Sequence, residues 1–314
     1  MPSEFGLIQR YFTRPPADGV LLGVGDDAAL LAPPAGEVLA VTVDTLVAGR
    51  HFPLNTPPAA IAHKALAVNL SDLAAMGATP RWFLLALTLP DASDAFLSEF
   101  ASALFALADE AGITLVGGDT TRGPLAISIT AMGSVPAGQA LRRSGARPGD
   151  GIYVSGTVGD AGLGLLQALQ PGHASLSAFE AAFVRQRLDY PQPRLALGIA
   201  LRGQATACLD ISDGLAQDLG HILDASGVGA ELDLQALPLS SALRTLPETQ
   251  AWQLALAAGD DYELCFTAPP GFSPQALPGN VPVTRIGTVT AASGLVLTSR
   301  GVRVEHEFSG YQHF

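Results

Sequence analysis

Segments with the period of a β-strand alternate with longer segments of helical period along the chain. Strand-like apolar runs cover residues 38–44, 82–90 and 125–135, and helices are expected over about residues 57–76 and 93–111. Strands and helices that alternate in this way are typical of proteins in which helices cover a sheet. The pattern therefore predicts an α/β or α+β fold.

With 314 residues the chain is long enough for two domains, each with its own hydrophobic core. The segment "PAGQALRRSGARPGD", residues 136–150, interrupts the alternation and is typical of a linker. A second series of strands and helices begins directly after it with "GIYVSG". We therefore expect an N-terminal domain over residues 1–137 and a C-terminal domain over residues 138–314.

Charge and composition exclude several classes of protein. The chain has 29 acidic and 17 basic residues, a balance that opposes nucleic-acid binding. Its one lysine is Lys64 and no G-x-x-x-x-G-K-[ST] motif occurs, which excludes a P-loop nucleotide site. No apolar run reaches the ~20 residues that span a bilayer and no signal region is visible, so we expect a cytoplasmic protein with no membrane partner. Cys208 and Cys265 lie in apolar strand-like runs and are expected to be reduced core residues.

Aspartates recur at the ends of apolar strands and in glycine-containing turns, where α/β proteins build binding sites. For any single one of these aspartates, an Asx turn or a helix cap is the favoured interpretation. Five placements together favour a binding site. They are Asp27, Asp44, Asp119, Asp210 and Asp213.

The strand in "VTVDTLVAGRH" carries two oxygen ligands on one face. Its period of two puts Thr42 and Asp44 on the same side and Val43 on the other. A hydroxyl and a carboxylate are hard ligands of the kind that Mg²⁺ prefers, and Mg²⁺ usually shares its shell with substrate phosphates. His51 follows in the sequence and either meets a substrate or is an ordinary surface residue.

An aspartate on an otherwise apolar helix needs a partner, because an unpaired buried charge is costly. Asp72 lies on such a helix, in "HKALAVNLSDLAAMGA". One candidate partner is Lys64 on the same sector of the helix. The other is a metal cluster that Asp72 shares with Asp27 and Asp44.

Two glycines precede the aspartate in "VGGDTTRGP". Gly117 and Gly118 allow backbone N–H groups to approach an anion closely, while Asp119 holds its counter-ion and Arg122 adds a positive charge. A turn between two strands is the alternative interpretation.

A similar arrangement occurs in "LDISDGL". Asp210 and Ser212 project from one face of a strand end, and the next helix offers an N-terminus that favours anions. Ser212 or Asp213 suits the N-cap of that helix, and Gly227 suits its end.

Three arginines are concentrated in the expected linker of this acidic chain, at positions 142, 143 and 147. They suit phosphate binding, although a linker with solvated arginines is the alternative.

Several carboxylates without a lysine-bearing loop predict a site that binds metal first and phosphate through the metal. The segment "GVGDDAALL", residues 23–31, fits this hypothesis. Gly23 and Gly25 supply a turn, Asp27 is the expected metal ligand and Asp26 is expected to be a turn residue.

From end to end the chain resembles the thiamine-monophosphate kinase family, which shares a superfamily with aminoimidazole ribonucleotide synthetase and selenophosphate synthetase. The motifs that carry the resemblance are "EFGLIQRYF", "GVGDDAALL", "VTVDTLVAGRHF", "HKALAVNLSDLAAMGATP", "VGGDTTRGP", "LRRSGARPGD", "LDISDGLAQDLGHI", "GDDYELCFT" and "GYQHF". The resemblance implies a homodimer with an aminoimidazole ribonucleotide synthetase-like fold. In it the mixed sheets of the N-terminal domains form a shared barrel-like interface, and an α/β C-terminal domain closes over the substrate. The implied reaction converts ATP and thiamine phosphate to ADP and thiamine diphosphate.

The same resemblance implies roles for individual residues. Several Mg²⁺ ions would be held by Asp27, Thr42, the backbone of Val43, Asp44, Asp72, Asp119, Asp210 and Asp213. ATP would contact Gly118, Asp119, Arg143 and Ser212. Thiamine phosphate would contact His51, Asp260 and Tyr311.

Three positions depart from the family pattern. Asp260 stands where the family commonly has glutamate, Gln312 replaces an aspartate of the C-terminal motif, and Ala28 replaces a frequent cysteine. The contact of residue 260 must therefore reach one methylene further or use water.

Two other functions fit the sequence less well. A selenophosphate synthetase would need a reactive cysteine or selenocysteine near the N-terminus, and no cysteine precedes Cys208. A catalytically silent protein that binds Mg-nucleotide would have no use for so many carboxylates, because like charges held together are costly.

Overall fold

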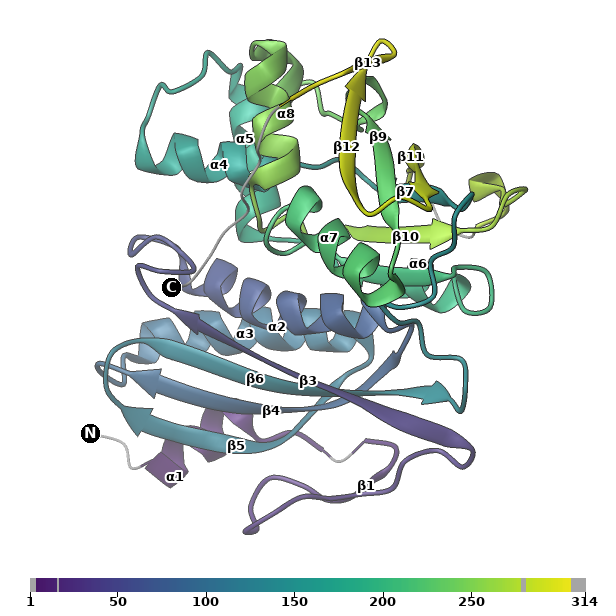
Figure 1. Cartoon of the computed structure of the whole chain (residues 1–314). Coiled ribbons are helices and arrows are strands. Elements are labelled where there is room, and N and C mark those ends of the chain that lie inside the picture. Colours follow the sequence, from purple (N-terminus) through teal and green to yellow (C-terminus); the bar gives the residue numbers. More distant parts are fainter. Residues whose placement is uncertain (1–3, 16, 278–280, 306–314) are drawn as a thin grey trace. The chain divides into compact units, whose positions relative to one another are not determined.

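The computed structural model of the chain describes residues 4–15, 17–277 and 281–305 (Figure 1). The contacts between Cα atoms divide the chain into two compact units. The N-terminal unit comprises Met1–Leu73 and Ala78–Gly138, and the C-terminal unit comprises Ala74–Gly77 and Gln139–Phe314. Within the described residues, no helix is long and apolar enough to cross a membrane.

The N-terminal unit is built on a four-stranded mixed sheet in the order β3-β6-β4-β5. These strands are β3 (Glu37–Val47), β4 (Thr79–Leu89), β5 (Thr114–Arg122) and β6 (Ala126–Pro136). β4 and β5 are parallel, and the other two pairings are antiparallel. The helices are α1 (Glu4–Leu7), the π-helical turn η1 (Ile8–Phe12), α2 (Pro58–Ala75) and α3 (Asp94–Ala111), and the short strands β1 (Val20–Leu22) and β2 (Leu30–Leu31) form a separate ribbon.

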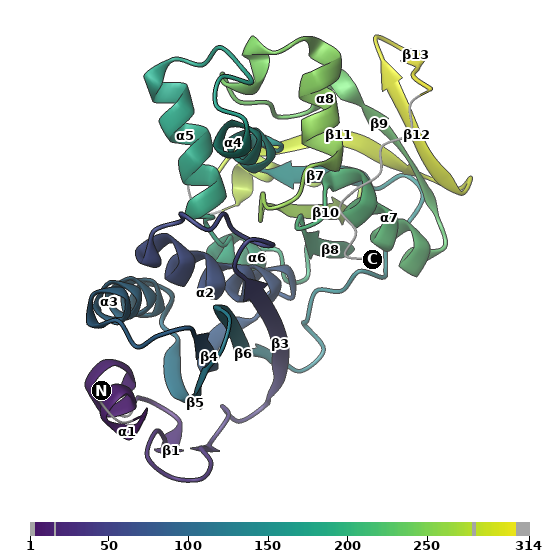
Figure 2. The same ribbon diagram turned by 90° about the vertical axis from the view of Figure 1, so that its left-hand side faces the viewer.

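Helices α2 and α3 cover the same face of this sheet (Figure 2). The ends of α3 follow from its sequence, since the Ser93 side chain accepts a hydrogen bond from the backbone N–H of Phe96 and Gly112 ends the helix in the left-handed conformation. Leu66, Leu70 and Leu73 of α2 are almost completely buried, as the helical period predicts.

β3 is an edge strand whose two faces differ in character. Thr42 and Asp44 are half-buried on one face, whereas Val43 is 62% exposed on the other. The predicted alternation of these three residues is therefore confirmed. β3 and β6 pair without interruption from Glu37↔Pro136 to Val47↔Ala126, which fixes this alternation along the whole strand.

The C-terminal unit contains a seven-stranded sheet in the order β13-β12-β9-β11-β7-β10-β8. The strands are β7 (Gly151–Ser155), β8 (Ala207–Asp210), β9 (Gly229–Asp233), β10 (Leu264–Ala268), β11 (Val283–Thr290), β12 (Gly294–Ser299) and β13 (Val302–Arg303). The helices are α4 (Asp160–Leu169), α5 (Ala178–Asp189), α6 (Leu195–Ala200), α7 (Leu215–Ser226) and α8 (Glu248–Ala257), with short 3₁₀ turns at Leu234–Ala236, Leu243–Thr245 and Pro274–Ala276.

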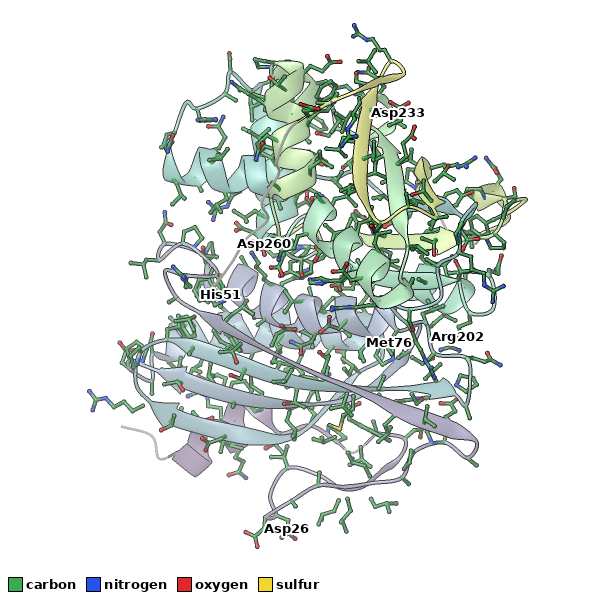
Figure 3. The ribbon with its side chains drawn as sticks, in the orientation of Figure 1. Asp26, His51, Met76, Arg202, Asp233 and Asp260 are labelled. Carbon is green, nitrogen blue, oxygen red and sulfur yellow. The ribbon has the colours of Figure 1, made fainter. Side chains whose placement is uncertain are left out.

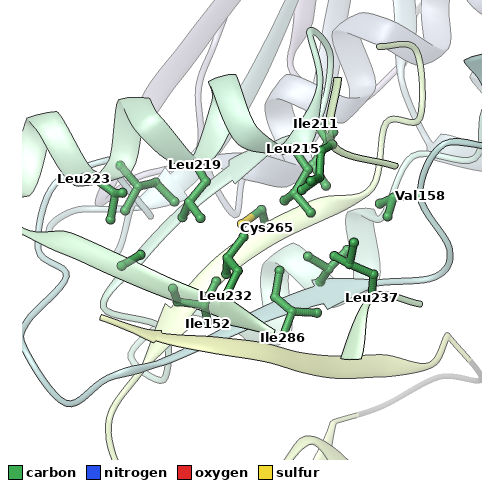
Figure 4. Close-up of a cluster of buried hydrophobic side chains, with 14 of the residues drawn as sticks. Ile152, Val158, Ile211, Leu215, Leu219, Leu223, Leu232, Leu237, Cys265 and Ile286 are labelled. Atoms are coloured by element: carbon green, nitrogen blue, oxygen red, sulfur yellow. The ribbon is translucent and has the colours of Figure 1, made fainter. Parts of the chain in front are cut away.

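The main core of the C-terminal unit lies between its sheet and helix α7 (Figure 4). Ile152 and Leu232 from the sheet pack there with Leu215 and Leu219 from the helix. Cys265 belongs to this cluster and Cys208 to a second one, and both thiols are free and buried. The prediction of reduced core cysteines is therefore confirmed.

Helix α7 begins differently from the prediction. Neither Ser212 nor Asp213 is its N-cap, because that position falls on Gly214, which has no capping side chain. The Asp218 carboxylate, one turn inside the helix, instead accepts hydrogen bonds from the backbone N–H groups of residues 212, 213 and 214. The predicted end of the helix at Gly227 is confirmed by its left-handed conformation.

Candidate functional site

One group of oxygen ligands in the N-terminal unit combines β3 with α2. The Thr42 hydroxyl of β3 donates a hydrogen bond to the Asp72 carboxylate of α2. Burial raises the pKa of Asp44 to about 7, and the charge of the nearby Asp72 carboxylate adds to the shift. Two carboxylates held this close favour a proton or a cation between them, so the group suits a hard cation.

Lys64, the other candidate partner of Asp72, is buried and contacts the loop after β3. It is 3% exposed, and its ammonium donates a 3.3 Å hydrogen bond to the carbonyl oxygen of His51. Lys64 therefore ties the loop after β3 to helix α2.

Asp27 does not join Asp44 and Asp72 as the shared cluster would require. Across residues 4–15, 17–277 and 281–305, no three Asp, Glu, His or Cys side chains group closely enough to hold a metal ion. Asp26, next to Asp27, lies far from His51 within the N-terminal unit (Figure 3). A cation bound by the Thr42, Asp44 and Asp72 oxygens would therefore complete its shell with backbone, water or substrate oxygens.

Asp27 instead lines a cavity of about 800 Å³ in the N-terminal unit. The glycine loop supplies one wall with Gly25, Asp26 and Asp27, and β5 supplies another with Gly118 and Asp119. Apolar residues from the N-terminal helical turn and the sheet line the remainder: Ile8, Phe12, Leu84, Leu85, Leu115 and Met132. An apolar cavity with two convergent acidic walls suits a ligand that has a flat apolar part and a charged part bound through cations.

The wall formed by Gly118 depends on close backbone packing. Gly118 has φ 153°, and a Cβ atom at this position would lie 1.9 Å from the carbonyl oxygen of Leu85. Only glycine fits here, and the exposed Asp119 follows directly. Because these residues belong to the continuous strand β5, the alternative interpretation as a turn between strands is wrong.

Ion pairs that were not predicted from the sequence join the segment of Ile8 and Phe12 to helix α3. Arg10 makes a bidentate pair with Asp94 of α3, at 2.8 and 3.1 Å. The Arg14 guanidinium pairs in the same way with Asp109, at 2.7 and 3.1 Å. No local sequence signal pairs these residues, because the partners lie 84 and 95 residues away along the chain.

His51 has a defined orientation at the end of β3. Its Nδ1 atom accepts a 3.0 Å hydrogen bond from the backbone N–H of Val47. A backbone N–H can only donate, so the proton of the neutral ring lies on Nε2. His51 can therefore offer an Nε2–H donor to an anion.

The predicted residues of the C-terminal unit gather on two loops that are joined to each other. Asp210, 6% exposed, ends β8, and the half-buried Ser212 and Asp213 follow it. The backbone N–H of Asp260 donates to the carbonyl oxygen of Ser212 at 2.9 Å, so Asp260 lies beside this loop. Burial raises the pKa of Asp218 to about 6, while three backbone N–H groups act in the opposite direction.

Two other predicted contacts have different settings. Arg143 is exposed in the segment between β6 and β7, where its carbonyl oxygen accepts a 3.5 Å hydrogen bond from the Ser226 hydroxyl. Tyr311 and Gln312 lie outside the described residues.

Comparison with known families agrees with this two-part arrangement. The family model "AIR synthase related protein, N-terminal domain" matches residues 25–135, and "AIR synthase related protein, C-terminal domain" matches residues 147–300. The chain is thus an AIR synthase related protein. Within this class it is similar to the thiamine-monophosphate kinases of Escherichia coli K12 (50% identity) and Salmonella typhimurium LT2 (49% identity), over 99% of this chain and 98% of each relative. The chain belongs to the thiamine-monophosphate kinase family.

Solved structures give the same relationship. The thiamine-monophosphate kinase of Stenotrophomonas maltophilia K279a is 50% identical, with a TM-score of 0.83 over 90% of this chain and 92% of that one. AaThiL, solved in complex with AMPPCP and TMP, is 32% identical, with a TM-score of 0.78 over 90% of this chain and 89% of that one.

Proposed function

We propose that this chain transfers the γ-phosphate of ATP to thiamine monophosphate and so forms thiamine diphosphate, the final step of its biosynthesis. The observation that carries the proposal is the group of hard oxygen ligands at Thr42, Asp44 and Asp72, in a chain half identical to thiamine-monophosphate kinases over its length. AaThiL binds TMP together with AMPPCP, an analogue of ATP, which supports both substrates. A cytoplasmic location is part of the proposal, because ATP is the co-substrate.

The cavity of the N-terminal unit is the proposed nucleotide site. Its apolar lining suits an adenine base, and the close approach of the Gly118 backbone suits a phosphate chain. The predicted domain of residues 1–137 would thus bind ATP and metal. Arg143 and Ser212, from the domain predicted over residues 138–314, are proposed to complete the contacts with ATP.

Magnesium is the proposed cation, in several copies. The residues proposed to hold it are Asp27, Thr42, the backbone of Val43, Asp44, Asp72, Asp119, Asp210 and Asp213. Bound Mg²⁺ would neutralise the phosphate charges and align the two substrates for in-line transfer.

The chain needs no general base for this reaction. The attacking group is a phosphate monoester whose second pKa is about 6, so it is already ionised near neutral pH. The remaining task is to hold two anions close together in the correct orientation. His51 is proposed to donate its Nε2–H to the phosphate of thiamine phosphate, while Asp260 and Tyr311 are proposed to contact the cationic thiazolium ring.

A homodimer is also proposed, with β3 at its interface. Leu39, Val41 and Val43 form an apolar row along the outer face of this edge strand and are 43–62% exposed. A long exposed apolar edge strand usually pairs or is covered in a stable protein. A second copy of the same strand is the partner that the family resemblance implies.

The test is an assay of ADP formation by purified protein with Mg²⁺ and ATP. We expect ADP when thiamine phosphate is present, and none with unphosphorylated thiamine, which lacks the attacking phosphate. ADP formation with selenide or an aminoimidazole-type substrate in place of thiamine phosphate would refute the proposal.

A further inference from the structure

The loop that carries Asp260 has an unusual backbone conformation. Asp260 has φ 70° and Tyr262 has φ 50°, both in the left-handed region. An aspartate adopts this region with little difficulty, but a tyrosine there is a clear outlier. Such conformations cost on the order of 1–3 kcal/mol each and persist only where the surrounding structure enforces them.

Backbone hydrogen bonds enforce this conformation from one side. The N–H of Tyr262 donates to the carbonyl oxygen of Ile211 at 2.8 Å, and the N–H of Ile211 donates to that of Glu263 at the same distance. Together with the bond from Asp260 to Ser212, they join this loop to the segment that follows β8.

A buried group of charges holds the loop from the other side. The Glu263 side chain, 1% exposed, accepts hydrogen bonds from Ser155 at 2.5 Å, from Arg187 at 3.0 Å and from Arg194 Nε at 2.6 Å. The Arg187 guanidinium also donates to the carbonyl oxygen of Asp261 at 3.2 Å. Glu263 and Asp261 are therefore both fixed on the inner side of the loop.

Asp261 adds a third attachment. Its side-chain carboxyl oxygens accept the backbone N–H groups of Gly159 at 2.5 Å and Ala161 at 3.3 Å, at the N-terminus of α4. With residues 261 and 263 buried, Asp260 and Tyr262 are left half-buried on the opposite side of the loop.

This geometry brings a hydroxyl to the carboxylate that is proposed to meet the substrate. The phenolic oxygen of Tyr262 donates a 3.1 Å hydrogen bond to Oδ1 of Asp260. A hydrogen bond to a carboxylate restricts its rotation and keeps its negative charge in one place. The aromatic ring of Tyr262 lies on the same side of the loop, and an aromatic face attracts a cation.

We infer that Tyr262 is a positioning residue for thiamine phosphate. Its hydroxyl fixes the Asp260 carboxylate in the orientation that meets the cationic thiazolium ring. This inference rests on the proposed function. It also gives a function to the left-handed backbone at Tyr262, because strained backbone conformations cluster at functional sites.

The test compares Tyr262→Phe with a matched control, Tyr153→Phe. Tyr262→Phe keeps the ring and removes only the hydroxyl, whereas Tyr153 lies in a hydrophobic cluster elsewhere in the same unit. For Tyr262→Phe we expect the KM for thiamine phosphate to rise about 5- to 10-fold, with kcat and the KM for ATP within about twofold of wild type. Tyr153→Phe should keep all three values, and Asp260→Asn should raise the KM for thiamine phosphate at least as much as Tyr262→Phe does.

A second measurement separates positioning from a structural effect. Unphosphorylated thiamine carries the same cation without the phosphate, so its inhibition constant should rise by the same factor in Tyr262→Phe. An equal rise in the KM for ATP, or an inhibition constant for thiamine equal to that of Tyr153→Phe, would overturn the inference. If wild-type protein forms no ADP in response to thiamine phosphate, the proposed function itself fails.

Discussion

Replacement of Gly118 by alanine should disrupt the N-terminal unit at one point in its sheet. The added Cβ atom would lie 1.9 Å from the carbonyl oxygen of Leu85, 2.7 Å from its carbonyl carbon and 2.9 Å from its nitrogen. Close C···O contacts between strands are normally about 3.3–3.6 Å. Strand β5 would therefore have to move away from β4 by about 1.5 Å, because no flexible side chain is available to give way.

The cost has two parts. Forcing extra volume into a closely packed place typically costs about 1–3 kcal/mol, and a non-glycine residue with a φ of this kind adds about 1–3 kcal/mol. We expect a loss of about 4 kcal/mol in the free energy of unfolding of this unit. For a unit of this size, that loss corresponds to a fall in Tm of about 14 °C. Affinity for an ATP analogue should also fall at least about tenfold, because the displacement of β5 would move the cavity wall that Gly118 forms.

The neighbouring glycine provides the control. A Cβ atom on Gly117 would meet only Cδ2 of Leu84, at 3.2 Å, and a leucine side chain can move by a few tenths of an ångström. Gly117→Ala should therefore lower the Tm far less. Thermal unfolding and calorimetric titration with a non-hydrolysable ATP analogue measure both effects. If Gly118→Ala unfolds within about 2 °C of Gly117→Ala and binds the analogue equally well, the packing argument is refuted.

Three further predictions concern charged groups. Asp44→Asn should abolish turnover through loss of metal, and rates measured against Mg²⁺ concentration test it; an unchanged Mg²⁺ dependence would remove Asp44 from the proposed ligands. Burial raises the pKa of Asp261 to about 8, above the value near 4 of an unfolded chain, so the folded protein holds this proton more tightly and loses stability as the pH rises towards about 8. Asp261→Asn should reduce this loss in the free energy of unfolding by up to about 1.4 kcal/mol per pH unit. Urea unfolding between pH 5 and pH 8 measures it, and the same pH dependence of the free energy of unfolding in the variant and the wild type would contradict the prediction. Asp94→Asn combined with Asp109→Asn should remove the ion pairs that hold the segment of Phe12 at the cavity wall. Because exposed ion pairs are individually weak, we expect the KM for ATP to rise only about threefold at low salt. A KM equal to that of the wild type would show that the wall does not depend on these ion pairs.

Sequence patterns correctly predicted the features that depend only on residues close together along the chain. Alternation alone placed Thr42 and Asp44 on one face of β3, and Gly227 marked the end of α7 because a left-handed terminal residue is most often glycine. The N-terminus of α7 was predicted wrongly for a related reason. A carboxylate inside the first turn, that of Asp218, satisfied the N–H groups that a side chain in front of the helix would otherwise bind.

The contacts that hold the loop of Asp260 could not be predicted from the sequence, because the residues that make them are distant along the chain. Arg187 and Arg194 lie 76 and 69 residues from Glu263, and no local rule pairs them. The one available signal was the glutamate within the apolar run "YELCFTA", since a charge in such a position needs buried partners. This signal predicts that a partner exists without identifying it. The group that fixes the Asp260 loop therefore became visible only in the structure.

Strand β3 links the proposed metal site to the proposed dimer interface through its pairing with β6. The even-numbered residues Thr42 and Asp44 face the site, and the odd-numbered residues Val41 and Val43 face outwards. A slip of one residue would exchange the two faces, burying valine at the site and exposing the carboxylate in the apolar row. The β3–β6 ladder has no irregularity over its 11 pairs, whereas the pairings of β4 with β5 and with β6 each contain a register shift. The pairing is thus regular along β3, the strand that would serve both the metal site and the dimer interface. The irregular pairings lie on β4, where Gly118 of β5 packs closely against Leu85.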